Sequence, residues 1–225
     1  MLIKFLRALL GLALLPTCYA LARSFCLVLL NSNAPLVEGS CLLAGIVVFI
    51  ICWFIFPHPV KAYVFGHELT HVIWGLLFFA KPSKFKVGSK GGSVNLTKTN
   101  VLITLAPYFF PFYTFLIIAI ALIVELFVEP LPFIPIWLFM IGATWAFHIF
   151  FTFETLSQSQ PDIIVYGKMF SWPFIFIVNA IFVLLWVGVV TSTLSFTISS
   201  ICSCTFDAYR WVYYKSIEII SLFMQ

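Results

Sequence analysis

The chain has 225 residues, of which 63% are hydrophobic and only 9% are charged, and its formal net charge is +4. A water-soluble domain carries about 25% charged residues, because it must cover its core with a hydrated surface. The composition therefore excludes a soluble globular enzyme and a disordered chain. It also lacks the basic face of a nucleic-acid-binding protein. We expect an integral membrane protein, with the lipid bilayer as its main surrounding and no nucleic-acid partner.

Six apolar segments follow one another, separated by short polar joints. Each is close to the ~20 residues that a helix needs to cross a bilayer. Their apolar character is continuous rather than alternating, and helices satisfy the backbone within lipid, so we expect helices. The predicted fold is an all-α, multi-pass bundle of about six transmembrane helices, a single integral membrane domain over residues 1–225. The predicted segments are Ala8–Leu30, Cys41–Phe56, Val60–Ala80, Val101–Phe127, Phe133–Phe153 and Met169–Val190.

The two ends of the chain are less regular than its middle. A basic start and an apolar run ending in Pro16–Ala20 are typical of a cleavable signal peptide. The apolar character resumes after Arg23, which favours a helix that is not cleaved. Residues 191–225 form a tail of mixed composition, in which Trp211–Phe223 is typical of an amphipathic helix lying at the membrane interface.

A polar interval separates the third segment from the fourth. Apolar and polar residues alternate in Phe85–Val87 and again in Ser93–Thr97, on either side of the glycine-rich stretch Gly88–Gly92. This pattern indicates a β-hairpin, with an ordinary lysine-rich loop as an equal alternative. A hairpin here would leave an edge strand that can pair with an extended peptide. The candidate substrate-binding residues on that edge are Val94, Asn95 and Leu96.

The third segment contains the motif His67-Glu68-Leu69-Thr70-His71. Side chains four residues apart lie on one face of a helix, so His67 and His71 can bind one metal ion. Glu68 lies about 100° further round the helix and can act as general base toward water at that ion. Ionisable side chains at membrane depth are costly and mark functional sites. We therefore predict a zinc hydrolase, with structural hydrogen bonding as the alternative.

A catalytic zinc site needs a third protein ligand and leaves a fourth position for water. We favour Asp162, because Pro161 biases Gln160 away from the helical region, and extended backbone could then present the carboxylate at the start of the sixth helix. A carboxylate also offsets the charge of zinc, which neutral imidazoles do not. His148 stays open as an oxyanion donor or alternative ligand. The full set of candidates is His58, Glu125, Glu129, His148, Glu154 and Asp162.

These features resemble the site-2 protease family of intramembrane zinc metallopeptidases. The resemblance is carried by the His67–His71 motif, the hairpin, Ala106-Pro107 in the next helix and Pro161-Asp162 before the last core helix. It covers about Val60–Val190 and implies a metallopeptidase core over residues 60–190. The family implies cleavage in or next to a transmembrane segment of a membrane protein or peptide, with the hairpin edge holding the substrate as an added strand.

The chain departs from the family at two positions. The family usually has an asparagine shortly after Gly-Pro, and Leu105–Pro111 contains none. Ile163 follows Asp162, where the family usually has glycine. His148 is a candidate for the missing polar role. Two other functions are a membrane transporter, which would not need a glutamate at this spacing, and a catalytically inactive membrane-binding relative, against which the intact motif argues.

Overall fold

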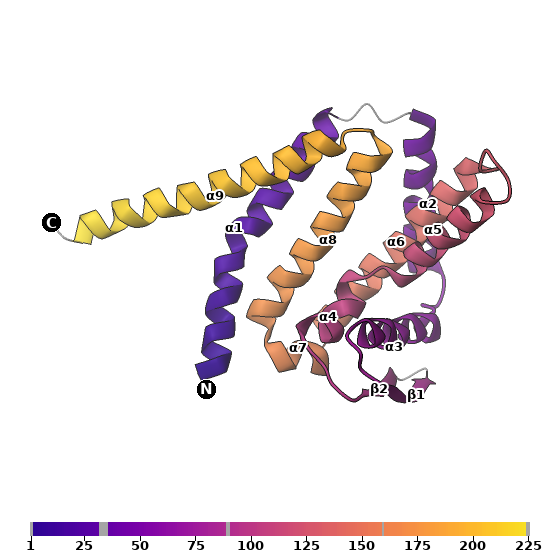
Figure 1. The fold of residues 1–225 in the computed structure, drawn as a ribbon, viewed down its shortest axis with the longest axis horizontal. Helices are drawn as coiled ribbons and strands as arrows, with labels where there is room; N and C mark the ends of the chain where they lie inside the picture. Colours follow the sequence, from indigo (N-terminus) through magenta and orange to yellow (C-terminus); the bar gives the residue numbers. More distant parts are fainter. Residues whose placement is uncertain (1, 32–35, 89–90, 159, 224–225) are drawn as a thin grey trace. The chain divides into compact units, whose positions relative to one another are not determined.

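The computed structural model describes residues 2–31, 36–88, 91–158 and 160–223, and these are mostly helical (Figure 1). The chain divides into two compact units, Met1–Ala34 with Val165–Gln225 and, separately, Pro35–Ile164. The motif histidines and Asp162 all belong to the second unit. A two-stranded antiparallel sheet lies in that unit as well.

The first unit contains three long helices, α1 (Leu2–Asn31), α8 (Lys168–Val190) and α9 (Leu194–Phe223). A small residue lets α1 and α8 approach closely, because a Cβ atom on Gly11 would lie only 1.9 Å from the carbonyl oxygen of Met169. Such contacts between small residues and backbone are typical of helices that pack in lipid. The helix predicted in the tail, Trp211–Phe223, is the C-terminal part of α9, which is longer than the sequence suggests; its interfacial position stays a prediction.

The second unit is built around the helices that position the motif. α2 and α6 lie side by side, and glycines bring their backbones together, because a Cβ atom on Gly45 would lie 2.0 Å from the carbonyl oxygen of Phe139. α3 contacts both α4 and α5. The helices of this unit are α2 (Leu36–Ile55), α3 (Val60–Leu77), α4 (Val101–Phe109), α5 (Phe112–Glu125) and α6 (Ile134–Ser157), followed by the start of α7 (Pro161–Tyr166).

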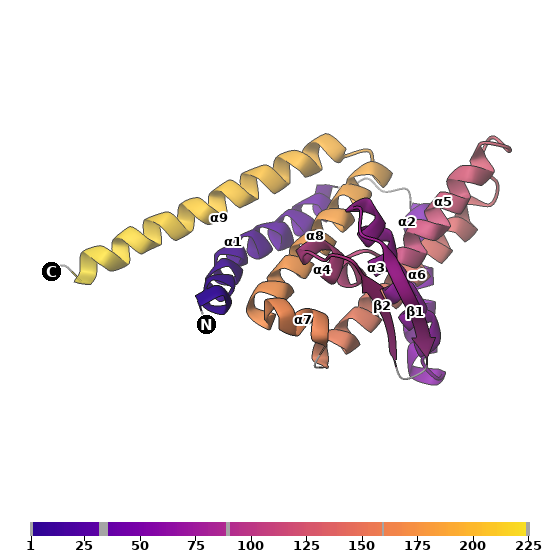
Figure 2. The same cartoon turned by 60° about the horizontal axis from the view of Figure 1, so that its bottom comes forward.

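The predicted hairpin is confirmed. β1 (Pro82–Gly88) pairs antiparallel with β2 (Gly91–Leu96) between α3 and α4. The predicted turn residues Ser89 and Lys90 lie outside the described residues. Both strands contact α3, and Figure 2 shows the hairpin lying along that helix. The loop alternative is therefore excluded for the two strands.

The predicted fourth segment forms two helices rather than one. α4 and α5 are bent by 76° relative to each other at Phe110-Pro111. Phe110 has an extended ψ of 100°, because a residue that precedes proline is driven out of the helical region. Pro107, by contrast, lies inside α4 without ending it. Pro111 thus marks the break, and the result is a sharp corner and not a curved span.

Among the described residues, three helices, α1, α6 and α8, are long and apolar enough to cross a membrane, and the bent α4–α5 pair would be a fourth if it is a single span. This supports a membrane protein. The prediction of about six transmembrane helices is not confirmed. The third predicted segment, α3, does not qualify because Lys61, His67, Glu68 and His71 lower its hydropathy. Within the second, the stretch Gly39–Ile55 of α2 is apolar.

Candidate metal site

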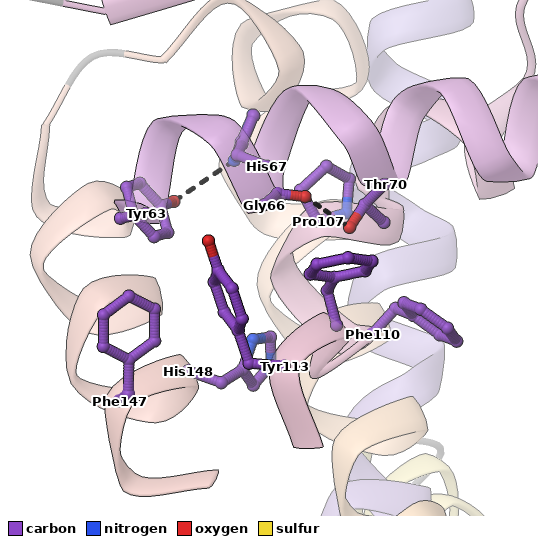
Figure 3. Close-up of a pocket in the computed structure, with 10 residues that line it drawn as sticks. Tyr63, Gly66, His67, Thr70, Pro107, Phe110, Tyr113, Phe147 and His148 are labelled. Carbon is purple, nitrogen blue, oxygen red and sulfur yellow. Dashed lines mark hydrogen bonds between the residues drawn. The ribbon is translucent and has the colours of Figure 1, made fainter. Parts of the chain in front are cut away.

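The motif lies on α3, as predicted. His71 and Glu68 are buried, and His67 is half-buried. The two imidazole rings lie edge to face with their centroids 5.0 Å apart, which is the consequence of a four-residue spacing on a helix. Nearby, the Thr70 hydroxyl donates to the carbonyl oxygen of Gly66 at 2.7 Å (Figure 3), so this polar group makes its bond within the helix.

Asp162 completes a three-residue cluster. Its Oδ2 atom lies 3.4 Å from Nε2 of His67 and 3.4 Å from Nε2 of His71. Ligand atoms around a tetrahedral zinc ion, at zinc–ligand distances of about 2.0–2.1 Å, are about 3.3–3.4 Å apart. Each nitrogen is therefore spaced from the carboxylate oxygen like two ligands of one zinc ion, and the three ligand atoms all lie within 4.8 Å of one another. Among the described residues, this trio is the group of His, Cys, Asp or Glu side chains that could hold a metal ion.

The backbone at Asp162 differs from the prediction. We expected extended chain leading into the sixth helix, but Pro161 and Asp162 begin the separate short helix α7. Proline suits the first helical position, since its missing N–H would have no helical partner there. Gln160, the residue before Pro161, lies outside the helix as expected. Asp162 thus sits in the first turn of α7, where the helix dipole favours a carboxylate.

Hydrogen bonds behind the imidazoles hold the two rings in place. His71 Nδ1 lies 2.9 Å from the carbonyl oxygen of Ile103, which can only accept, so Nδ1 carries a proton and Nε2 is the ring nitrogen that faces Asp162. His67 Nδ1 lies 3.2 Å from the Tyr63 hydroxyl (Figure 3). Outer partners of this kind fix the orientation of metal-binding histidines.

Tyr108 is a site residue that the sequence does not reveal. Its fully buried side chain comes from α4, and its hydroxyl donates to Oδ2 of Asp162 at 3.2 Å. The Tyr108 ring also meets the His67 ring edge to face, with centroids 5.3 Å apart. Tyr108 belongs to Leu105–Pro111, the stretch that lacks the family's asparagine. The sequence feature that could have pointed to Tyr108 is its hydroxyl group within this otherwise apolar stretch.

The charge of the cluster comes from Asp162. Burial alone would raise the pKa of this carboxyl, but hydrogen bonds with His67 and His71 outweigh burial and hold the pKa below its ordinary range. The carboxylate is therefore anionic at neutral pH. An anionic ligand beside two imidazoles is the arrangement that partly offsets a bound dication.

The other candidate ligands lie outside the cluster. Oε2 of Glu154 lies 3.8 Å from Nδ1 of His58, away from the trio. Glu125 and Glu129 are exposed where α5 ends. His148 is buried on α6 and lines a small cavity of about 20 Å³ that His67 also lines (Figure 3). The geometry therefore favours Asp162 as third ligand over either His148 or Glu154.

A cavity of about 560 Å³ opens beside the cluster. The trio, Glu68 and residues 92–96 of β2 contribute to its lining. The hairpin is seated directly against the carboxylate side chain, because a Cβ atom on Gly92 would lie 2.6 Å from Cγ of Glu68 and 2.9 Å from its Oε1. Only a glycine fits at this contact without displacing Glu68.

The backbone of β2 has one edge paired with β1 and one edge to which no described strand is bonded. The Thr97 N–H donates to the carbonyl oxygen of Lys81 at 3.2 Å, and Asn95 pairs with Ser83. Backbone groups alternate in direction along an antiparallel strand. The N–H and C=O of Asn95 therefore face β1, whereas those of the alternate residues face the free edge. The predicted substrate-binding residues Val94, Asn95 and Leu96 all line the cavity.

Comparisons of the chain with protein-family models, with curated proteins and with solved structures find no match. The resemblance to the site-2 protease family therefore stays a prediction, carried by the motif residues. The function must be inferred from the geometry of the site.

Proposed function

We propose that the chain is a zinc metalloprotease of the membrane that hydrolyses peptide bonds in or next to a transmembrane segment of another protein, in the manner of the site-2 protease family. One observation carries the proposal. The ligand atoms of His67, His71 and Asp162 lie within 4.8 Å of one another, and Glu68 follows the first histidine. A transporter would account for polar groups in so apolar a chain but not for a carboxylate at the spacing of a hydrolytic motif.

Zinc suits this set of ligands. Two imidazole nitrogens and one carboxylate oxygen, each nitrogen 3.4 Å from the oxygen, match a three-ligand catalytic site with a position left for water. When bound, zinc makes water more acidic and polarises a carbonyl group. The same donor types also hold iron in non-haem oxygenases, so the identity of the metal is itself a test of the proposal.

The protein's own groups would then carry out two tasks, proton transfer and binding of the substrate backbone. Glu68 accepts a proton from the attacking water and passes it to the departing amine. The outward N–H and C=O groups of Val94 and Leu96 bond the substrate backbone as an added strand. Strand addition matters in a membrane, because a substrate helix must give up its internal hydrogen bonds before its amide can be reached, and those groups need new partners.

Metal analysis and peptide hydrolysis by the purified protein test this proposal together. Wild type should contain one zinc ion per chain and cleave an apolar transmembrane peptide. The double variant His67→Ala/His71→Ala should lose the metal, and Asp162→Asn should lower zinc affinity and abolish hydrolysis. His148→Ala, altering a buried histidine outside the cluster, should retain zinc. Zinc content unchanged in the double variant would end the proposal.

Glu68→Gln separates catalysis from binding. The amide has the same shape as the carboxylate but cannot accept the proton, so this variant should keep its zinc and lose hydrolysis. A transporter or an inactive binding protein would keep its flux or its binding in the same variant. Iron in place of zinc in the wild type would point to oxygen chemistry instead of hydrolysis.

A further inference from the structure

A second cavity, of about 360 Å³, meets the first one at the motif. His67, Glu68, Gly92 and Gln160 line both cavities. Because one water molecule occupies about 30 Å³ of liquid, the second cavity has room for a complete amino-acid side chain. A peptide lying along β2 beside Glu68 would therefore have an open space next to the bond that is attacked.

The walls of this second cavity differ in character. One wall is apolar and is made by Val60, Val64 and the stacked rings of Tyr63 and Phe151, whose centroids are 4.6 Å apart. The remaining lining is more polar and includes Glu154 and Gln158. Its described lining contains two carboxylates, those of Glu68 and Glu154, and no lysine or arginine.

The Glu154 side chain lines this cavity and is 39% exposed. Its Oε2 atom accepts no hydrogen bond within the described part of the chain. The nearest base is His58, whose ring is stacked on Trp53 at 3.7 Å and whose Nε2 lies 3.2 Å from the Trp53 carbonyl oxygen. Because Nε2 donates its proton to the Trp53 carbonyl oxygen, Nδ1 of a neutral His58 turns a lone pair toward Glu154. His58 Nδ1 and Glu154 Oε2, which are 3.8 Å apart, therefore form an ion pair only when the imidazole is protonated.

We propose that this second cavity is a specificity subsite for a lysine or arginine side chain of the substrate, bound through Glu154. The inference rests on the proposed function and names its substrate class. The aliphatic stem of such a side chain packs on the apolar wall while its cation reaches the carboxylate. Basic residues commonly flank transmembrane segments, so the subsite selects cleavage next to the membrane-spanning part of a substrate.

Cleavage of matched peptides tests the subsite. The probes are synthetic peptides with one apolar transmembrane sequence and a single flanking position changed to Lys, Gln or Glu, scanned along the flank. Wild type should show kcat/KM at least about tenfold higher for Lys than for Gln at one position, a ratio equivalent to 1.4 kcal/mol, and lowest for Glu. Glu154→Gln should remove the preference, and Glu154→Lys should invert it. The exposed Glu125→Gln is the matched control and should behave like wild type.

Binding of the same peptides gives a readout that needs no hydrolysis. In the Glu68→Gln background, the Lys peptide should bind about tenfold more tightly than the Gln peptide, and adding Glu154→Gln should remove the difference. A Lys preference that persists in the Glu154 variants, or no preference in either assay, would overturn the subsite. If all peptides are hydrolysed at equal rates, the subsite is contradicted and the protease function stands. If the Lys peptide binds selectively but no peptide is hydrolysed, the protease function is contradicted and the subsite stands.

Discussion

Tyr108 donates to the oxygen of Asp162 that also faces both histidines. A hydrogen bond to a charged group contributes about 1.5–3 kcal/mol, more than one between neutral groups. The position of this carboxylate oxygen is therefore set from three sides, by two imidazoles and one phenol. Asp162 on its own, in a helix as short as α7, would have more freedom to turn away.

The variant Tyr108→Phe should lower zinc affinity without removing a ligand. Loss of an outer partner typically reduces metal affinity about 10–100-fold, and the phenylalanine ring keeps the packing. Competition with a chelating dye measures the change. Tyr113→Phe is the control, because the Tyr113 hydroxyl donates to the carbonyl oxygen of Ala62 and not to a ligand. Equal zinc affinities in the two variants would show that Tyr108 does not position Asp162.

At the scale of elements, the hairpin combines two structural roles. β2 packs on α3 beside the motif, and its free edge offers backbone groups to another chain. The direction of those groups depends on register, and register follows from the Lys81–Thr97 hydrogen bond. Val94 therefore presents its N–H outward, whereas Asn95 presents its N–H to β1.

A proline at Val94 should slow hydrolysis while zinc content stays constant. Proline has no N–H, so the substitution removes one donor from the free edge and leaves the pairing with β1. Val94→Thr is the matched control, since it changes the side chain and keeps the donor. The measurement is kcat/KM on an apolar transmembrane peptide. Full activity in Val94→Pro would show that this edge does not bind substrate.

The sequence predicts elements better than contacts between them. The sixth predicted segment, Met169–Val190, agrees closely with α8, because a continuous apolar run is bounded by polar residues. The turn at Phe110-Pro111 could be located, but its 76° angle could not, because proline forbids a helical conformation without specifying what replaces it. The His67–His71 pair follows from helical periodicity alone. The contact of Tyr108 with Asp162 spans 54 positions and depends on tertiary packing.

At the scale of the whole molecule, the candidate site lies within one compact unit. His67, Glu68, His71, Tyr108 and Asp162 all belong to Pro35–Ile164. The other unit holds α1, α8 and α9 and supplies two of the three helices that qualify as membrane spans. The predicted boundaries of the metallopeptidase core, residues 60 and 190, stay a prediction.

Damage to the first unit should therefore leave metal binding intact. The Tyr209 hydroxyl joins α9 to α1, donating to the carbonyl oxygen of Ala13 at 2.8 Å and lying 2.9 Å from Thr17 Oγ1. Tyr209→Phe should lower stability by about 1 kcal/mol, which corresponds to about 2–4 °C in Tm for a chain of this size. The exposed Tyr213→Phe serves as control. Thermal unfolding and zinc analysis in detergent check both parts, and loss of zinc in Tyr209→Phe would contradict the expectation.

The contact between Gly92 and Glu68 has a mechanical consequence. With no side chain between the strand and the carboxylate, any shift of β2 is transmitted to Glu68 without an intermediary. A peptide that joins the free edge adds a third strand, and neighbouring strands impose their twist on one another. Arrival of a substrate would then also move Glu68, the proposed general base. The contact at Gly92 would thus link substrate binding to the position of this carboxylate.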